Sequence, residues 1–204
     1  IRPDMFRDQR LGETSRDILD YLSSREADQR IFKADLLVDR AHLVMLKEKG
    51  LISEEVYSKI ISALDEIGEG LPLESGEDIH AAIEAAVIDR VGPEGGRMHT
   101  ARSRNDEVAT CIRLALREEM LELMAEELAY IRTLVRLAAE HKETIIPGFT
   151  HTQHAQPTTL AHHLLAHSDA AFRDLGRLED AYSRVNQNPL GAAAPAVSGG
   201  GLAS

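Results

Sequence analysis

One uninterrupted stretch decides the fold: residues 106–141 read DEVATCIRLALREEMLELMAEELAYIRTLVRLAAEH. The stretch is rich in Ala, Leu, Glu, Met and Arg, all good helix formers, and no Gly or Pro occurs between Ala101 and Ile146. About 36 helical residues, at roughly 1.5 Å each, span about 54 Å. A compact domain of this length has a radius of gyration of only about 17 Å. We therefore predict one helix that runs across the whole molecule.

A second long segment follows on the C-terminal side of this helix. Pro157, Thr158 and Thr159 open residues 158–186, in which Gly176 is the one glycine. Two helices of this length with Leu- and Ala-rich faces need partners along their whole length. We expect a bundle that other subunits complete.

Shorter helical segments precede the long helix. Apolar residues three and four apart predict helix between Ser15 and Lys49, and Gly50 stops it. Ser53, followed by two glutamates, predicts a capped helix that runs to about Ile67.

The next segment, GEGLPLESGE at 68–77, is a predicted loop, and Asp78 caps a further helix that GPEGG at 92–96 breaks. We find no repeat and no convincing strand run. The predicted fold class is therefore all-α.

Composition excludes several functions. The net charge of −11 argues against nucleic-acid or anionic-membrane binding, since both need a basic face. The single cysteine, Cys111, excludes an internal disulfide framework and suits a reducing cytosol. We find no apolar run of membrane-spanning length and no signal segment, so we expect a cytoplasmic protein. Because the chain begins with Ile1 and ends APAVSGGGLAS, we also expect it to be a fragment or incomplete.

The first candidate site is GGRMHTARSRNDEVAT at 95–110, which gathers Arg97, His99, Arg102 and Arg104 at the start of the long helix. Arginine binds carboxylates in a bidentate manner, and a helix N-terminus favours anions. One interpretation is a locally positive pocket that steers and binds a carboxylate-bearing substrate. The other is a solvated Arg-rich loop followed by an ordinary cap.

The second candidate is PGFTHTQHAQPTTLAHHLLAH at 147–167, which holds five of the nine histidines. A metal site could use His163 and His167, four apart on a helix, but the usual paired Cys or intervening Glu is missing. General acid–base chemistry by a loop histidine beside hydroxyl and amide groups is the alternative. We interpret His162, His163 and His167 as surface or interface residues. The segment NPLGAAAPA at 188–196 is a small-residue turn that indicates close packing.

Four stretches in this order carry a resemblance to a known family: SRDILDYLSSREADQRIFKADLLVDRAH, EDIHAAIEAAVIDRVGPEGGRMHTARSRNDEVAT, PGFTHTQHAQPTT and NPLGAA. Together they resemble the argininosuccinate lyases of the fumarase/aspartase superfamily, which includes the lens delta-crystallins. The resemblance runs from about residue 15 to residue 194. It implies long helices of a fumarase/aspartase-type bundle at 104–204 and a smaller helical N-terminal domain at 1–103. It also implies a homotetramer whose active sites combine motifs from three subunits.

The reaction that the resemblance implies is reversible β-elimination of argininosuccinate to arginine and fumarate, without a metal or an organic cofactor. His151 matches the family's acid–base histidine. The positions that match substrate contacts of the family, or that lie in or near its pocket, are Ser24, His99, Ser103, Arg104, Asn105, Thr150 and Gln156. These types suit a substrate with three carboxylates, one of which gains charge in the transition state.

Three departures qualify the resemblance. Ala101 stands where the family usually has Gly, and a positive φ there would cost about 1 kcal/mol. A WGGRF-like N-terminal segment is absent. The third motif, a Ser-rich loop followed by Met-Pro-Lys-Lys-Asn-type residues, is also absent. We therefore expect the 204-residue chain alone to have little or no lyase activity. A catalytically silent, crystallin-like relative and a lyase for another succinyl substrate such as adenylosuccinate remain as alternatives.

Overall fold

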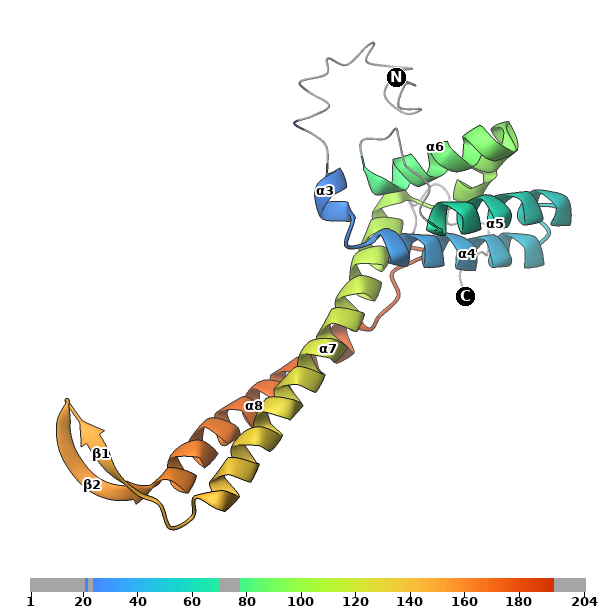
Figure 1. The fold of residues 1–204 in the computed structure, drawn as a ribbon. Coiled ribbons are helices and arrows are strands. Elements are labelled where there is room, and N and C mark those ends of the chain that lie inside the picture. The colour runs from blue at the N-terminus through green and yellow to red at the C-terminus, as the bar shows by residue number, and fades with distance from the viewer. Residues whose placement is uncertain (1–20, 22–23, 70–77, 193–204) are drawn as a thin grey trace. The chain divides into compact units, whose positions relative to one another are not determined.

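The structure, a computed structural model, describes residue 21 and residues 24–69 and 78–192. These residues are mainly helical, which confirms the predicted all-α class, and they add one small two-stranded sheet (Figure 1). The elements are α3 (Arg25–Asp28), α4 (Phe32–Glu48), α5 (Glu54–Gly68), α6 (Ile79–Val91), the 3₁₀ helix η1 (Pro93–His99), α7 (Arg104–Glu140), β1 (Ile145–Thr150), β2 (Gln153–Thr159) and α8 (Leu160–Val185).

The chain divides into two compact units, and α7 contributes to both. The first unit comprises residues 1–115 and 188–204, and the second comprises residues 116–187. The domain assignment of 1–103 and 104–204 stays a prediction. Among the described residues, no helix combines the length and the apolar character needed to cross a bilayer.

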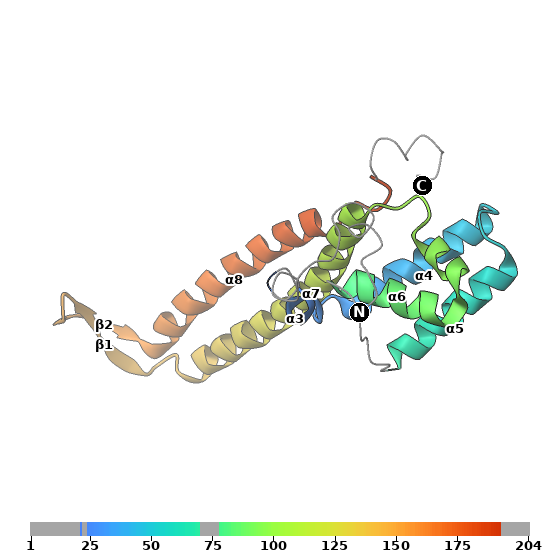
Figure 2. The same ribbon diagram turned by 90° about the horizontal axis from the view of Figure 1, so that it is seen from above.

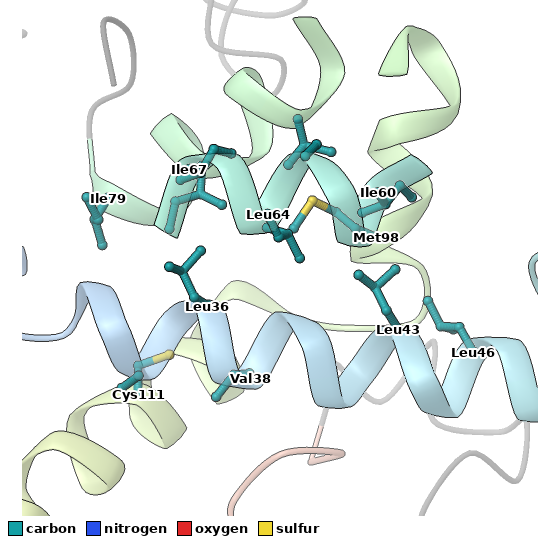
Figure 3. Packing of buried hydrophobic residues seen from close by; sticks show 14 of the residues in the cluster. Leu36, Val38, Leu43, Leu46, Ile60, Leu64, Ile67, Ile79, Met98 and Cys111 are labelled. Carbon is teal, nitrogen blue, oxygen red and sulfur yellow. The ribbon is translucent and has the colours of Figure 1, made fainter. Parts of the chain in front are cut away.

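The core of the first unit lies among α4, α5, α6 and η1, whose helices lie side by side (Figures 1 and 2). Figure 3 shows Leu36 of α4 pointing toward Ile67 of α5, and Leu43 of α4 pointing toward Ile60 of α5 and Met98 of η1. Fully buried side chains of this kind stabilise the fold by roughly 1.5–3 kcal/mol each.

Two of the predicted helix caps in this unit are confirmed. The Ser53 hydroxyl accepts a hydrogen bond from Val56 N at 3.3 Å, and the Asp78 carboxylate accepts one from Ala81 N at 2.7 Å. Each satisfies a backbone donor that the first helical turn leaves unpaired.

The second unit contains most of α7 and all of α8, the two predicted long helices. α7 covers 37 residues and α8 covers 26, close to the predicted ranges. The Thr159 hydroxyl caps α8 by accepting from His162 N at 3.2 Å. Ile131 of α7 packs against Ala171 and Leu175 of α8. Many apolar side chains on this helix pair stay exposed, as expected for helices that need further partners: Leu121, Leu123, Leu128, Val135, Leu165 and Phe172.

The prediction that no strand is present is wrong for residues 145–159. β1 and β2 form an antiparallel hairpin in which Pro147 pairs with Pro157. Proline lacks an N–H donor and is excluded from central strands, but both strands of a two-stranded sheet are edges and tolerate it.

Gly148 sits at an irregularity in this hairpin, between Pro147 and Phe149. A Cβ atom at Gly148 would lie 2.6 Å from the carbonyl oxygen of Gln156, so the two backbones approach too closely for any side chain.

We expect Gly148→Ala to shift the hairpin and destabilise it, because the added methyl group must push the Gln156 backbone away. Gly176→Ala is the control: it lies inside α8 with nothing within 4 Å of the added Cβ, and should stabilise that helix by about 0.5–1 kcal/mol. Backbone amide hydrogen exchange of residues 145–159 measures the effect. Unchanged exchange in Gly148→Ala would contradict the close approach.

Candidate functional site

The N-terminal end of α7 presents three of the predicted substrate-binding residues, Ser103, Arg104 and Asn105. Ser103 stands at the cap position, where its hydroxyl accepts from Asn105 N at 3.3 Å. Asp106 reaches back and accepts from Ser103 N at 3.1 Å, the reciprocal arrangement of a capping box. The helix therefore starts where the sequence placed it. Its dipole favours a negative charge beside these residues.

A cluster of buried, ion-paired side chains lies beside the N-terminus of α7. Nη2 of Arg102 donates to Oδ1 of Asp39 at 2.6 Å and to Oε1 of Glu107 at 2.8 Å. All three side chains are no more than 2% exposed. The cluster joins α4 to the first turn of α7 through Arg102.

Arg104 is the partly exposed member of the same network. Its Nη1 donates to Oε2 of Glu107 at 2.9 Å, and its Nη2 donates to Oε2 of Glu84 on α6 at 3.0 Å. The side chain remains 27% exposed. Arg104 can therefore still offer donors to a ligand while two carboxylates hold its guanidinium.

The predicted locally positive pocket is wrong for Arg102 and Arg104. Three carboxylates, those of Asp39, Glu84 and Glu107, compensate the two arginines. Asp39 and Glu84 lie 63 and 20 residues from their arginine partners, so the linear pattern does not show them. What these arginines offer is oriented hydrogen-bond donors rather than excess positive charge.

Burial shifts the pKa of several groups in the cluster. It raises the pKa of Asp39 to about 7, although Arg102 opposes the shift. It also raises the pKa of Glu107 against the pull of Arg102 and Arg104. Burial, with the positive charge of the same two arginines, lowers the pKa of His99 to about 4, so His99 is neutral at physiological pH. Burial also acts to lower the pKa of His80. The Asp35 carboxylate, 2.7 Å from Nδ1, outweighs this effect, so the pKa of His80 is raised.

We expect Asp39→Asn to change how stability depends on pH. The folded-state pKa of about 7 lies above the ordinary value of 3.8, so the folded state binds this proton more tightly than the unfolded state. That contribution is fully present below pH 3.8 and is lost as the pH rises to about 7. Asn still accepts from Arg102 but does not titrate. In urea unfolding across this window, the free energy of unfolding of the variant should rise relative to that of the parent chain as the pH rises. Parallel plots of that free energy against pH would contradict the assignment.

Two buried groups combine residue types that can bind metals. Asp35, His80 and Cys111 form one, and Asp35, Asp39 and Glu107 form the other. The thiol of Cys111 donates to Asp35 at 3.4 Å, and burial raises its pKa. We assign no metal to either group. In the first, His80 and Cys111 both already contact the Asp35 carboxylate. In the second, Arg102 already contacts Asp39 and Glu107, and a second cation beside it would be repelled. His163 and His167 lie on α8 with their rings edge to face at 4.9 Å, and both are exposed.

Of the remaining sequence-predicted residues of the first unit, His99 lies beside this network and Ser24 contacts α3. His99 lies with Nδ1 3.6 Å from Glu107. Ser24 precedes α3 and donates to Asp28 at 2.7 Å, and Asp28 also accepts from the backbone of Ile79. Ala101 has φ 58°, the positive value for which a glycine was expected, so this loop carries backbone strain.

In the second unit, Thr150, His151 and Gln156 all belong to the hairpin and are exposed. His151 and Thr152 form its tip with φ of 47° and 64°, the left-handed region that residues other than glycine rarely adopt. Such strain is often found at functional sites. The Thr152 hydroxyl donates to the His151 carbonyl oxygen at 2.6 Å.

Sequence reasoning missed the acidic half of the network, namely Asp35, Asp39, Glu84 and Glu107. One signal was available. Asp35, Asp39 and His42 recur at helical spacing on the buried face of α4, where polar residues require partners.

Comparison with known proteins places this arrangement in a family. A family model described as Lyase matches residues 14–203, so the chain belongs to this lyase family. The chain is 63% identical over 197 residues to argininosuccinate lyase of Methanothrix thermoacetophila, covering 96% of this chain and 40% of the relative. It is 61% identical over 187 residues to argininosuccinate lyase of Methanosarcina mazei, covering 90% of this chain and 38% of the relative. The resemblance to argininosuccinate lyases is thereby confirmed.

A solved structure, an EDDS lyase variant with bound fumarate, matches with a TM-score of 0.77 at 32% identity. The match covers 99% of this chain and 42% of that structure. The chain therefore spans about two fifths of the length of the proteins it matches.

Proposed function

We propose that this chain carries part of the active site of an argininosuccinate lyase that serves arginine biosynthesis. The observation that supports the proposal most is the 63% identity to a relative of that name across 96% of the chain. The partly exposed donors at the start of α7 and the exposed His151 are compatible with a polyanionic substrate. We also propose that the protein is cytoplasmic and a homotetramer with shared sites, since long apolar stripes on α7 and α8 are uncovered.

In the proposed reaction, a proton leaves the carbon next to a substrate carboxylate, and a carbanion-like aci-carboxylate forms. The C–N bond then breaks, a C=C bond forms, and the departing guanidino nitrogen takes up a proton. His151 takes an acid–base role in these transfers. Ser103, Arg104 and Asn105 hold a carboxylate at the N-terminus of α7, where their donors stabilise developing charge. Thr150 and Gln156 contact the substrate from the hairpin. Ser24 and His99 are further substrate-binding residues. No metal or organic cofactor takes part.

The proposal gives a direct test of Arg104. In the full-length enzyme, Arg104→Ala should raise the KM for argininosuccinate by about tenfold or more, since a charge-assisted hydrogen bond contributes about 1.5–3 kcal/mol. Arg136→Ala is the control: this arginine pairs with Glu140 on the exposed surface of α7. Unchanged KM and kcat in Arg104→Ala would show that Arg104 does not contact the substrate.

A further test separates the family's substrates. Argininosuccinate should raise the melting temperature of the full-length protein, and adenylosuccinate should not. Preferential stabilisation by the nucleotide would refute the choice of substrate.

The 204-residue chain alone should release little or no fumarate, because it lacks the Ser-rich motif of the family pattern.

A further inference from the structure

We propose that Glu107 is a positioning residue that aligns Arg104 for the substrate by binding both arginines of the Arg-Ser-Arg segment at once. This inference rests on the proposed function of Arg104. It assigns a role to a residue that does not itself present an atom to the ligand.

The geometry singles out Glu107 within the cluster. Its Oε1 accepts from Arg102 at 2.8 Å and its Oε2 accepts from Arg104 at 2.9 Å. Asp39 contacts only Arg102 among the hydrogen bonds of the described residues, and Glu84 contacts only Arg104. Glu107 is thus the carboxylate that links the two arginines on either side of Ser103.

The link matters because the two arginines differ in burial. Arg102 is 2% exposed and held between α4 and α7, whereas the Arg104 side chain is 27% exposed. A long, partly exposed arginine loses rotamer entropy when a ligand fixes it. Glu107 restrains Arg104 before binding, since the carboxylate itself is 1% exposed and packed at the first turn of α7.

Electrostatics also require an acid at this position. Two guanidinium groups two residues apart in the sequence repel each other in a buried setting, where the effective dielectric is low. Glu107 lies between them, and its two oxygens satisfy both. Arginine has five N–H donors, and the contacts to Glu84 and Glu107 take two of them in Arg104. Among the hydrogen bonds of the described residues, Arg104 uses these two donors, which leaves others to bind a substrate carboxylate in a fixed orientation.

The test is a double-mutant cycle in the full-length enzyme with argininosuccinate as the probe. Glu107→Gln keeps the shape and one acceptor oxygen, but replaces the other oxygen with a donor that cannot accept from arginine. We expect KM to rise about tenfold with kcat changed less than about threefold, since positioning acts on binding. In the Arg104→Ala background, Glu107→Gln should change KM by less than about twofold. Glu118→Gln is the matched control, because Glu118 pairs with Arg117 on the exposed surface of the same helix.

The outcomes separate the two levels of the proposal. If the full-length protein does not cleave argininosuccinate, the proposed function fails. If it does, and Arg104→Ala raises KM but Glu107→Gln does not, the role of Glu107 is overturned. Additive effects of the two substitutions on KM would overturn it as well, because Glu107 would then act by a route other than Arg104.

Discussion

Replacing His151 with Asn in the full-length enzyme should lower kcat for argininosuccinate cleavage by about a thousandfold. General acid–base catalysis by a positioned side chain contributes roughly 10²–10⁴-fold, and Asn cannot transfer a proton. Asn also tolerates the left-handed backbone that His151 adopts at φ 47°, so the hairpin tip should keep its shape. Release of fumarate, followed by its ultraviolet absorbance at saturating argininosuccinate, measures the loss.

The hairpin supplies a matched control for this experiment. His154 is also exposed and lies three residues further along, with its ring 4.9 Å from that of Phe149. His154→Asn should lower kcat by less than about tenfold if His151 alone carries the proton transfer. Equal losses from both substitutions would indicate a general effect on the hairpin and contradict the assignment.

The second large effect concerns stability. Arg102→Met should lower the free energy of unfolding of the first unit by about 3–5 kcal/mol, because it leaves Asp39 and Glu107 buried without their shared cation. Met fills similar space, so the loss reports charge rather than a cavity. Urea unfolding of the 204-residue chain, followed by circular dichroism, measures the change.

Arg136→Met provides the comparison on the surface. Arg136 pairs with Glu140 at 2.8 Å, but both side chains are more than half exposed, so removing this pair should cost about 0.5 kcal/mol or less. Similar losses from Arg102→Met and Arg136→Met would show that the buried cluster does not hold the unit together.

The helices were predictable because their signals are local. The absence of Gly and Pro after Ala101 and the composition of the following stretch predicted α7 closely. Helix starts are marked by Ser53, Asp78 and Thr159, whose side chains each accept a hydrogen bond from the backbone N–H three residues later. The hairpin at 145–159 was missed because Pro147 and Pro157 indicate breaks in a strand, and only a sheet made of two edges accepts both.

The candidate site could be proposed from the sequence in part. Arg104 and His151 each stand in a local motif, at 95–110 and 147–167, and their roles stay predictions. The carboxylates that orient Arg104 could not be identified in this way, because Glu84 lies on another helix and the role of Glu107 depends on where two arginines point. Asp39 meets Arg102 across 63 residues, a separation at which spacing carries no information.

The most direct measurement of the central claim is a product assay on the full-length protein with argininosuccinate as the substrate. We predict that fumarate and arginine appear in equal amounts, without added metal, and that His151→Asn nearly abolishes both. No fumarate from argininosuccinate under conditions in which the protein is folded and assembled, or fumarate from adenylosuccinate instead, would contradict the claim.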